Sequence, residues 1–292
     1  MKSLHIELTS RCVLECPGCP RTWFKETFNQ PVPKLDLDPG LLEQFLDCEG
    51  GQQITHFHLE SNHGDCIYYP QLIEFVQRWR DSKTFTIVTN GSRRTKDFWQ
   101  SLNALLTPQD QIIFSIDGLE HNNHVYRVNS DWSSLRDAVE ICTQGPARVI
   151  WKTIVFAHNQ HELDQIKQYA TDAGVDQVIF VNTHRFGRDQ LMPDQQYIDT
   201  AMLYKNLDPA RAIAPKCGSH SKETFVTPEG YCWPCCWISS YYTLHKTDLW
   251  KSRDQFNMRH HNLDQVRAHI DQYAASLTPA TAHSVCSLTC GA

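Results

Sequence analysis

The chain of 292 residues lacks the features of several protein classes. No apolar stretch approaches the roughly 20 residues that a membrane span needs, and the first residues contain no apolar core of a signal peptide. No run of like charge exceeds two residues, and the net charge of −6 disfavours nucleic acid as a partner. The 13 glycines and 14 prolines follow no repeat, which excludes a collagen-like chain. We therefore expect a globular, cytoplasmic protein that does not interact with membranes.

Cysteine, in contrast, is abundant, with 12 residues in the chain. Such a number indicates disulfides in an exported protein or metal ligands in a cytoplasmic one. Because no export signal is visible, clustered cysteines in this sequence favour metal binding.

Short apolar runs alternate with longer stretches of helical spacing over residues 1–186. Strands are predicted at 4–8, 54–59, 85–88, 112–116, 149–156 and 178–181, and helices at 38–46, 72–79, 98–105, 135–142 and 163–170. This order predicts an α/β fold of right-handed βαβ units around a parallel sheet, either open or partly closed as a barrel. In both forms the chemistry lies at the carboxyl ends of the strands.

Three local signals place helix ends. Asp38 before Pro39 is a good helix start, and Asn159 with Glu162 forms a plausible capping box for the last of these helices. Gly174 is expected to end that helix.

The strand–helix order stops near residue 186. Residues 187–215 are interpreted as a connecting segment with one helix near 197–204, and residues 216–292 as a second, small α+β domain. That domain has a predicted hairpin with its turn at 228–230 and a helix over 263–273. It contains six of the 12 cysteines and little apolar sequence, so we expect a metal to hold it together.

The first cysteine cluster, Cys12, Cys16 and Cys19, follows the first predicted strand with the spacing C-x3-C-x2-C. Three thiolates in one loop can bind three irons of a [4Fe-4S] cube and leave the fourth iron open for a substrate or cofactor. A zinc site or disulfides are the alternatives.

With this loop, residues 4–182 resemble the radical S-adenosylmethionine (radical SAM) superfamily, in which the same spacing follows the first strand of a partial (β/α)6 TIM-like barrel. The resemblance implies that the open iron binds S-adenosylmethionine (SAM). One electron from the cluster then cleaves SAM to methionine and a 5′-deoxyadenosyl radical. The sequence departs from the family at Gly18, where an aromatic residue is usual.

The resemblance also implies SAM contacts at other strand ends. Asp65, in the loop after the second strand, offers a carboxylate to the SAM ammonium. Ser115, and Arg127 twelve residues later, are similar to the pair that holds the SAM carboxylate, which suits a guanidinium fork. Asn90 and Asp117, also at strand ends, complete the expected cofactor site.

The second cysteine cluster resembles the opening of SPASM and twitch extensions. Cys217, Gly230 and Cys235 fit C-x(9-15)-G-x4-C, with the glycine in the hairpin turn, and Cys286 with Cys290 would complete four ligands. The resemblance implies one auxiliary [4Fe-4S] cluster in a twitch-like domain. Cys232 and Cys236 compete with Cys235 as ligands, and a zinc ribbon is the alternative.

Together these features predict a radical SAM enzyme that abstracts hydrogen from its substrate. The twitch resemblance favours net oxidation of a small sugar-like alcohol, with the auxiliary cluster as electron acceptor and a flavodoxin or ferredoxin as electron donor. Modification of a peptide or protein is the second hypothesis. A non-catalytic iron–sulfur or zinc protein is a third, which the Ser115–Arg127 spacing disfavours.

Overall fold

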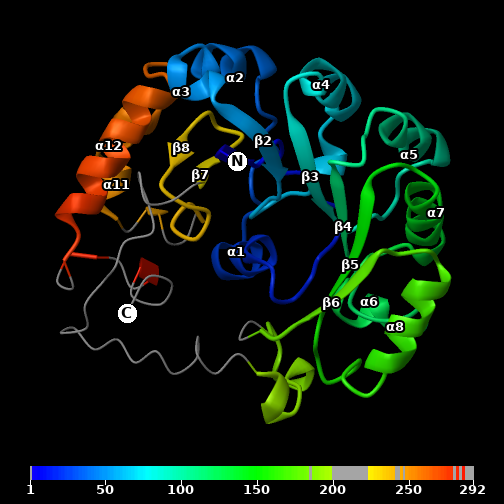
Figure 1. Cartoon of the computed structure of the whole chain (residues 1–292). Coiled ribbons are helices and arrows are strands. Elements are labelled where there is room, and N and C mark those ends of the chain that lie inside the picture. The colour runs from blue at the N-terminus through cyan, green and yellow to red at the C-terminus, as the bar shows by residue number, and fades with distance from the viewer. Residues whose placement is uncertain are drawn as a thin grey trace.

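A computed structural model describes residues 2–183, 186–198, 223–240, 244–245, 247–278, 281–282 and 285–286. Its centre is one curved sheet of eight strands in the order β6-β5-β4-β3-β2-β1-β7-β8 (Figure 1). The strands are β1 (Lys2–Ile6), β2 (Ile54–Leu59), β3 (Thr84–Thr89), β4 (Gln111–Ser115), β5 (Arg148–Ile154), β6 (Gln177–Val181), β7 (Glu223–Val226) and β8 (Cys232–Trp233). Neighbouring strands from β6 to β7 are parallel, and only the β7–β8 pair is antiparallel.

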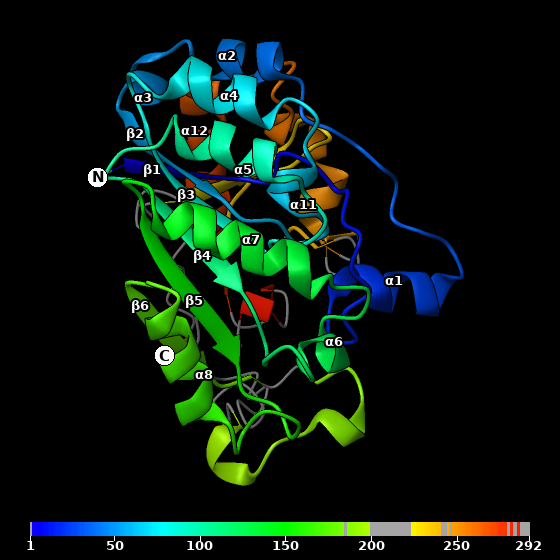
Figure 2. The ribbon, with the colours of Figure 1, turned by 90° about the vertical axis from the view of Figure 1, so that its right-hand side faces the viewer.

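Helices cover the convex side of this sheet (Figure 2). The helices of the chain's first part are α1 (Pro20–Phe28), α2 (Pro39–Leu46), α3 (Glu49–Gln52), α4 (Leu72–Trp79), α5 (Lys96–Asn103), α6 (Asn123–Tyr126), α7 (Trp132–Thr143) and α8 (Leu163–Asp172). Those after the hairpin are α11 (Asp248–Lys251) and α12 (Leu263–Ser276), and short 3-10 turns lie at Cys66–Tyr68, Asp189–Leu191, Gln195–Tyr197 and Arg253–Phe256.

The two faces of the sheet differ in polarity because side chains alternate along each strand. Residues such as Phe57, Leu59 and Trp151 are buried against the helices, where they form the main hydrophobic core. The alternate residues of the same strands include polar ones such as His58 and Lys152, which lie on the concave side. The sheet therefore presents several polar side chains along the inside of a partial barrel, and the mostly parallel sheet confirms the predicted fold class.

The C-terminal hairpin extends the barrel sheet. β7 pairs in parallel with β1, with Leu4 opposite Thr224, and β8 returns beside β7 after a turn in which Gly230 has a φ of 88°. The predicted hairpin is confirmed, whereas its docking on the first strand was not predicted. One apolar core runs from the barrel into α12. The predicted domain boundary at 215/216 and most of the predicted helix near 197–204 lie outside the described residues.

The strand and helix predictions for residues 1–183 are confirmed within a few residues, but the capping box is wrong. Glu162 stands at the N-cap of α8 without a side-chain capping bond. The Asn159 amide accepts a hydrogen bond from Phe156 N and donates to the carbonyls of Asp117 and Ile154, at 2.8–2.9 Å. Asn159 therefore joins the ends of two strands instead of capping a helix.

No helix within the described residues has the length and apolar character needed to cross a membrane.

We predict that Asn159→Ala lowers the free energy of unfolding by about 2–4 kcal/mol, because it removes the side-chain hydrogen bonds to Phe156 N and to the carbonyls of Ile154 and Asp117. Denaturant unfolding would measure this change. Gln168→Ala removes only an exposed bond to Asp172 and serves as the control, with an expected effect within about 0.5 kcal/mol. Equal effects of the two substitutions would contradict the role given to Asn159.

Candidate iron–sulfur and SAM site

The first cysteine cluster lies in the loop between β1 and α1, at the carboxyl edge of the parallel strands. Cys16 is buried, Cys12 and Cys19 are half-buried, and all three are free thiols. Cys19 N donates to Cys16 O at 3.0 Å, and Cys19 is also the N-cap residue of α1, with Pro20 in the first helical position. The start of the helix thus fixes the third cysteine relative to the second.

A small apolar cluster encloses the inner side of this loop. It contains Leu14 and Cys16 together with Tyr126, Phe156, Phe186 and Leu191, and the Tyr126 and Phe156 rings stack with centroids 4.1 Å apart. Next to Phe186, Gly187 has a φ of 76°, and a Cβ there would lie 2.2 Å from the carbonyl carbon of Pro17. The chain after β6 therefore packs directly on the cysteine loop, a contact that the sequence analysis missed.

Polar groups point at two of the sulfurs. Arg127 Nη1 lies 4.0 Å from Cys16 Sγ, and Asn90 Nδ2 lies 3.7 Å from Cys12 Sγ. Burial raises the pKa of the Cys12 thiol to about 12 and that of Cys16 to about 11. Thiolates at these positions therefore need a strong cationic partner, as a bound metal provides.

Three thiols from one loop are the donor set that a [4Fe-4S] cube takes from a protein. Within the described ranges, no three His, Cys, Asp or Glu side chains converge as ligands of one metal ion. In a [4Fe-4S] cluster each thiolate binds its own iron, so the sulfurs stand apart at separate corners. Cys12, Cys16 and Cys19 are three free thiols in one loop, and polar donors face Cys12 and Cys16, so their chemistry suits such a cluster.

Asp65 lies within a network of hydrogen bonds at the end of β3. Its carboxylate is buried and accepts hydrogen bonds from Asn90 N at 2.6 Å, Thr89 Oγ1 at 3.1 Å and Ile67 N at 3.2 Å. Burial raises its pKa to about 6, although these donors lower it. The geometry thus gives Asp65 and Asn90 a joint role, in which the carboxylate holds the β3 end beside Cys12.

Asp117 and Arg127 form a buried ion pair. Arg127 Nε donates to Asp117 Oδ2 at 2.6 Å, and Asp117 Oδ1 accepts from Ile154 N at 2.7 Å. Burial would lower the pKa of Arg127, but the Asp117 charge raises it, so the guanidinium stays charged. Asp117, which the sequence suggested as a cofactor contact, is fully buried and instead orients Arg127 toward Cys16.

Ser115 lies on the concave face at the end of β4, opposite Lys152 of β5 in the strand register. Near Lys152 is a polar group that sequence reasoning did not assemble. Glu60 Oε1 lies 3.6 Å from Lys152 Nζ, and Glu60 Oε2 lies 3.4 Å from His58 Nε2. The His58 ring stacks on His5, with centroids 4.7 Å apart. The alternation of polar residues on β1 and β2 is the sequence signal that could have indicated this group.

The second cysteine cluster is only partly described. Cys217 and Cys290 lie outside the described residues, and Cys235 and Cys286 are half-buried against the main core. Cys232 is fully buried on β8, and burial raises its pKa to about 12. Asn62, in the loop after β2, donates to Cys236 O at 2.8 Å. The loop that leads to Asp65 thus supports the turn with Cys235 and Cys236.

Comparison with solved structures finds one fold, although no family profile and no curated protein matches the sequence. SuiB of Streptococcus suis, bound to precursor peptide SuiA, matches 98% of this chain and 75% of its own, with a TM-score of 0.60 and 10% identity. anSMEcpe with bound AdoMet, which is SAM, matches 94% of this chain and 84% of its own, with a TM-score of 0.57 and 13% identity. Both proteins are radical SAM enzymes. This chain shares the fold of these enzymes.

Two further matches bear on how the radical SAM fold is used. BtrN, in complex with AdoMet and 2-DOIA, matches 96% of this chain and 88% of its own, with a TM-score of 0.51 and 13% identity. A second SuiB structure matches 82% of this chain, and the match covers 61% of the SuiB chain. At these identities the likeness establishes the fold, and the activity is argued from the residues of this chain.

We predict that Gly187→Ala loosens the cysteine loop. The added methyl group would meet the Pro17–Gly18 backbone, and the positive φ adds about 1–3 kcal/mol of strain. Alkylation of Cys16, followed by mass spectrometry of the peptide, should become several-fold faster.

Gly174→Ala provides the matched control. Gly174 has a φ of 82°, but its Cβ would meet only Thr143, at 3.4 Å or more. A similar loss of stability without faster Cys16 labelling is expected. Unchanged Cys16 labelling in Gly187→Ala would contradict the packing role of Gly187.

Proposed function

We propose that this chain is a radical SAM enzyme. The observation that carries the proposal is the loop of Cys12, Cys16 and Cys19 at the carboxyl edge of a radical SAM fold, with the Arg127 guanidinium held beside Cys16. When bound, a [4Fe-4S] cluster and SAM would supply a 5′-deoxyadenosyl radical that abstracts a hydrogen atom from the substrate.

The chain's own residues would bind and orient the cluster and SAM, and would exclude water from them. Cys12, Cys16 and Cys19 would hold the irons, and Arg127, kept charged by Asp117, would bind the SAM carboxylate with help from the Ser115 hydroxyl. Asn90, which Asp65 holds beside Cys12, would contact the cofactor there. The apolar cluster around Cys16 keeps water from the reacting centre.

For the substrate we propose a small hydroxylated molecule. Glu60, Lys152 and His58 lie on the concave face with side chains 25–37% exposed, so a ligand can reach them. Burial would raise the pKa of Glu60, but the His58 contact and the Lys152 charge lower it to about 2. The group thus offers a carboxylate acceptor and an ammonium donor with little net charge, which suits neutral hydroxyl groups.

Oxidation of such an alcohol to a ketone removes a C–H hydrogen atom, a hydroxyl proton and one electron. The His58 imidazole, next to the Glu60 carboxylate, is suited to take the proton. A second [4Fe-4S] cluster on Cys217, Cys235, Cys286 and Cys290, in a twitch-like domain of residues 216–292, would supply an electron acceptor. Peptide modification is the alternative, supported by the likeness to SuiB with its bound precursor peptide.

Anaerobic reconstitution tests the proposal. We expect about eight irons per chain, SAM binding and dithionite-dependent 5′-deoxyadenosine. In a Cys12/Cys16/Cys19→Ala variant we expect about four irons and no deoxyadenosine. About four irons in the wild type, or bound zinc, would remove the auxiliary cluster from the proposal, and a wild type that does not bind SAM would refute the proposed activity.

The positioning role of Asp117 gives a separate prediction. Asp117→Asn removes the charge that orients Arg127, so SAM affinity of the reconstituted protein should fall about tenfold, with iron content retained. Equilibrium dialysis with labelled SAM would measure the affinity. Asp137→Asn, which breaks the ion pair with Lys96 on α5, is the control. Wild-type affinity in Asp117→Asn would show that Arg127 needs no partner.

A further inference from the structure

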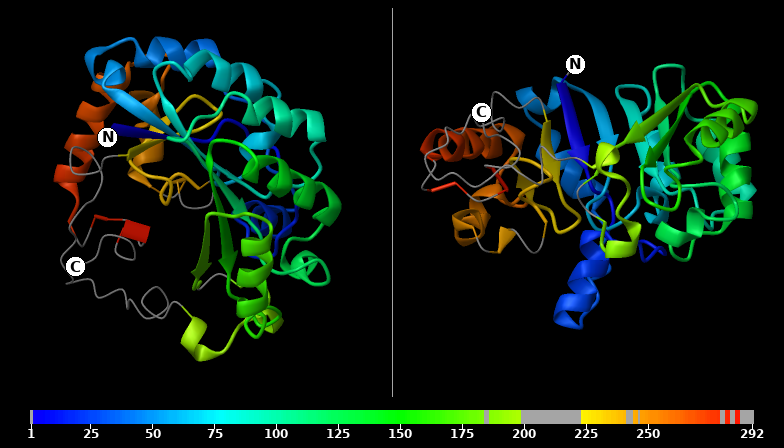
Figure 3. Two further views of the ribbon diagram at one scale, coloured as in Figure 1. Left: turned by 45° about the vertical axis from the view of Figure 1, so that its right-hand side comes forward. Right: turned by 90° about the horizontal axis from the view of Figure 1, so that it is seen from below.

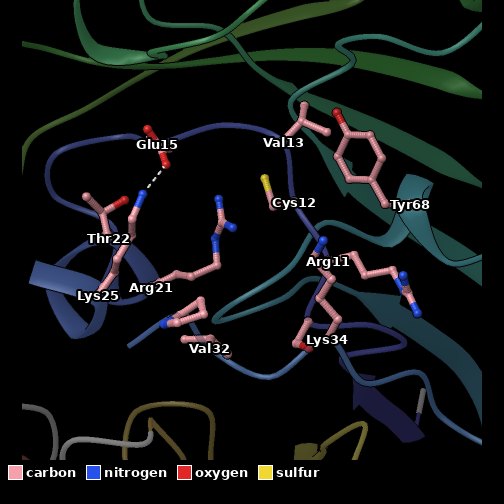
Figure 4. A pocket seen from close by; sticks show the side chains of 12 residues that line it. Arg11, Cys12, Val13, Glu15, Arg21, Thr22, Lys25, Val32, Lys34 and Tyr68 are labelled. Atoms are coloured by element: carbon pink, nitrogen blue, oxygen red, sulfur yellow. Dashed lines mark hydrogen bonds and ion pairs between the residues drawn. The ribbon is translucent and has the colours of Figure 1, made fainter. Parts of the chain in front are cut away.

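The outer side of the cysteine loop contains a basic pocket. Its volume is about 310 Å³, and Cys12 and Tyr68 contribute to its wall. Figure 4 shows Arg21 reaching toward Cys12 and the Lys25–Glu15 ion pair across the pocket. Because Cys12 is a candidate iron ligand, the pocket leads from the protein surface to the first coordination position of the proposed cluster.

Positive charge dominates this pocket, although the whole chain is acidic. Four cationic side chains and one carboxylate line it, namely Arg11, Arg21, Lys25, Lys34 and Glu15. Asp36 pairs with Arg11 at 2.8 Å and Glu15 pairs with Lys25 at 2.6 Å, so a positive excess remains on Arg21 and the exposed Lys34. An acidic partner would be attracted to this face of a chain with net charge −6.

Exposed apolar side chains gather at the same place. Val13 in the loop, and Trp23 and Phe28 on α1, are 37–49% exposed, and they are three of the eight large hydrophobic side chains exposed in the described part of the chain. Thr22 is the buried residue that α1 contributes, and the helix projects from the barrel (Figure 3). An aromatic residue within a basic rim is typical of a protein–protein contact and is more than a small anion needs.

We propose that α1 and the outer side of the cysteine loop form the docking surface for an acidic flavodoxin. Trp23 and Val13 would contact the exposed edge of the flavin, while Lys34 and its basic neighbours attract the acidic rim. In the transfer, the fully reduced flavin loses one electron and the cluster behind Cys12 gains it, with no bond made or broken. This inference rests on the proposed function, which requires a one-electron donor.

Direct binding is the first test and needs no turnover. Titration of the reconstituted protein with oxidised flavodoxin should give a dissociation constant that rises at least about fivefold between roughly 50 and 500 mM NaCl. Trp23→Ala and Lys34→Glu should each weaken binding at low salt by about fivefold or more. Phe180→Ala and Lys167→Glu, exposed residues on β6 and α8, are the matched controls and should bind as the wild type does.

Formation of 5′-deoxyadenosine is the second test. With reduced flavodoxin the two docking variants should be at least about fivefold slower than the wild type, and with dithionite, which needs no docking surface, they should match it. Equal losses with both reductants would show that the surface serves SAM or a substrate and would overturn the proposal. Binding that is insensitive to salt and to both substitutions would overturn it as well.

The two tests separate this proposal from the function on which it rests. A wild type that forms no deoxyadenosine with dithionite refutes the radical SAM activity, while the binding titration still reports on the surface. Deoxyadenosine with dithionite, but no flavodoxin binding, refutes the docking surface alone.

Discussion

The geometry of the candidate iron–sulfur and SAM site depends on the buried carboxylate of Asp117. A carboxylate with no exposed surface must be compensated, and here one oxygen accepts from Arg127 and the other from the backbone of Ile154. The Asp117 backbone is bonded as well, since its N–H donates to Asn123 and its carbonyl accepts from Asn159. One residue thereby joins the ends of β4 and β5 to α6, and the direction of the Arg127 guanidinium follows from these bonds. The position beside Cys16 is therefore set before any cofactor binds.

This arrangement explains which site residues a sequence can indicate. Cys12, Cys16 and Cys19 are recognisable because their spacing is local. Asp65 and Asp117 are also visible as polar residues at strand ends, but the partner of a carboxylate depends on the neighbouring strand. Asp65 bonds the end of β3, and Asp117 bonds Arg127 and the end of β5. Sequence position alone therefore indicates polar residues at strand ends, whereas only the packed structure shows which groups each carboxylate bonds.

In the fold, too, local patterns were predictable from the sequence and contacts between distant segments were not. β1 to β6 were predictable because alternating apolar residues describe a sheet with helices on one side, and α2 was predictable because Asp38 and Pro39 mark its start. α1 is a short helix that buries only Thr22, so its sequence contains no row of core residues to reveal it. The parallel pairing of β7 with β1 joins residues more than 200 positions apart, and no local pattern encodes that register. The capping box at Asn159 failed because a strand end competed for the same side chain.

The cysteine loop has two sides with opposite requirements. On the inner side, Tyr126, Phe156 and Phe186 form one apolar cluster with Cys16, and an apolar surrounding strengthens the Arg127 interaction with charged groups. On the outer side, the proposed reduction by a protein partner would require a cluster that is close to the surface. The buried Cys16 and the half-buried Cys12 beside the basic pocket would meet these two requirements within five residues. α1 projects beside that pocket and lines it with Arg21, Thr22 and Lys25, so the approach to Cys12 stays open.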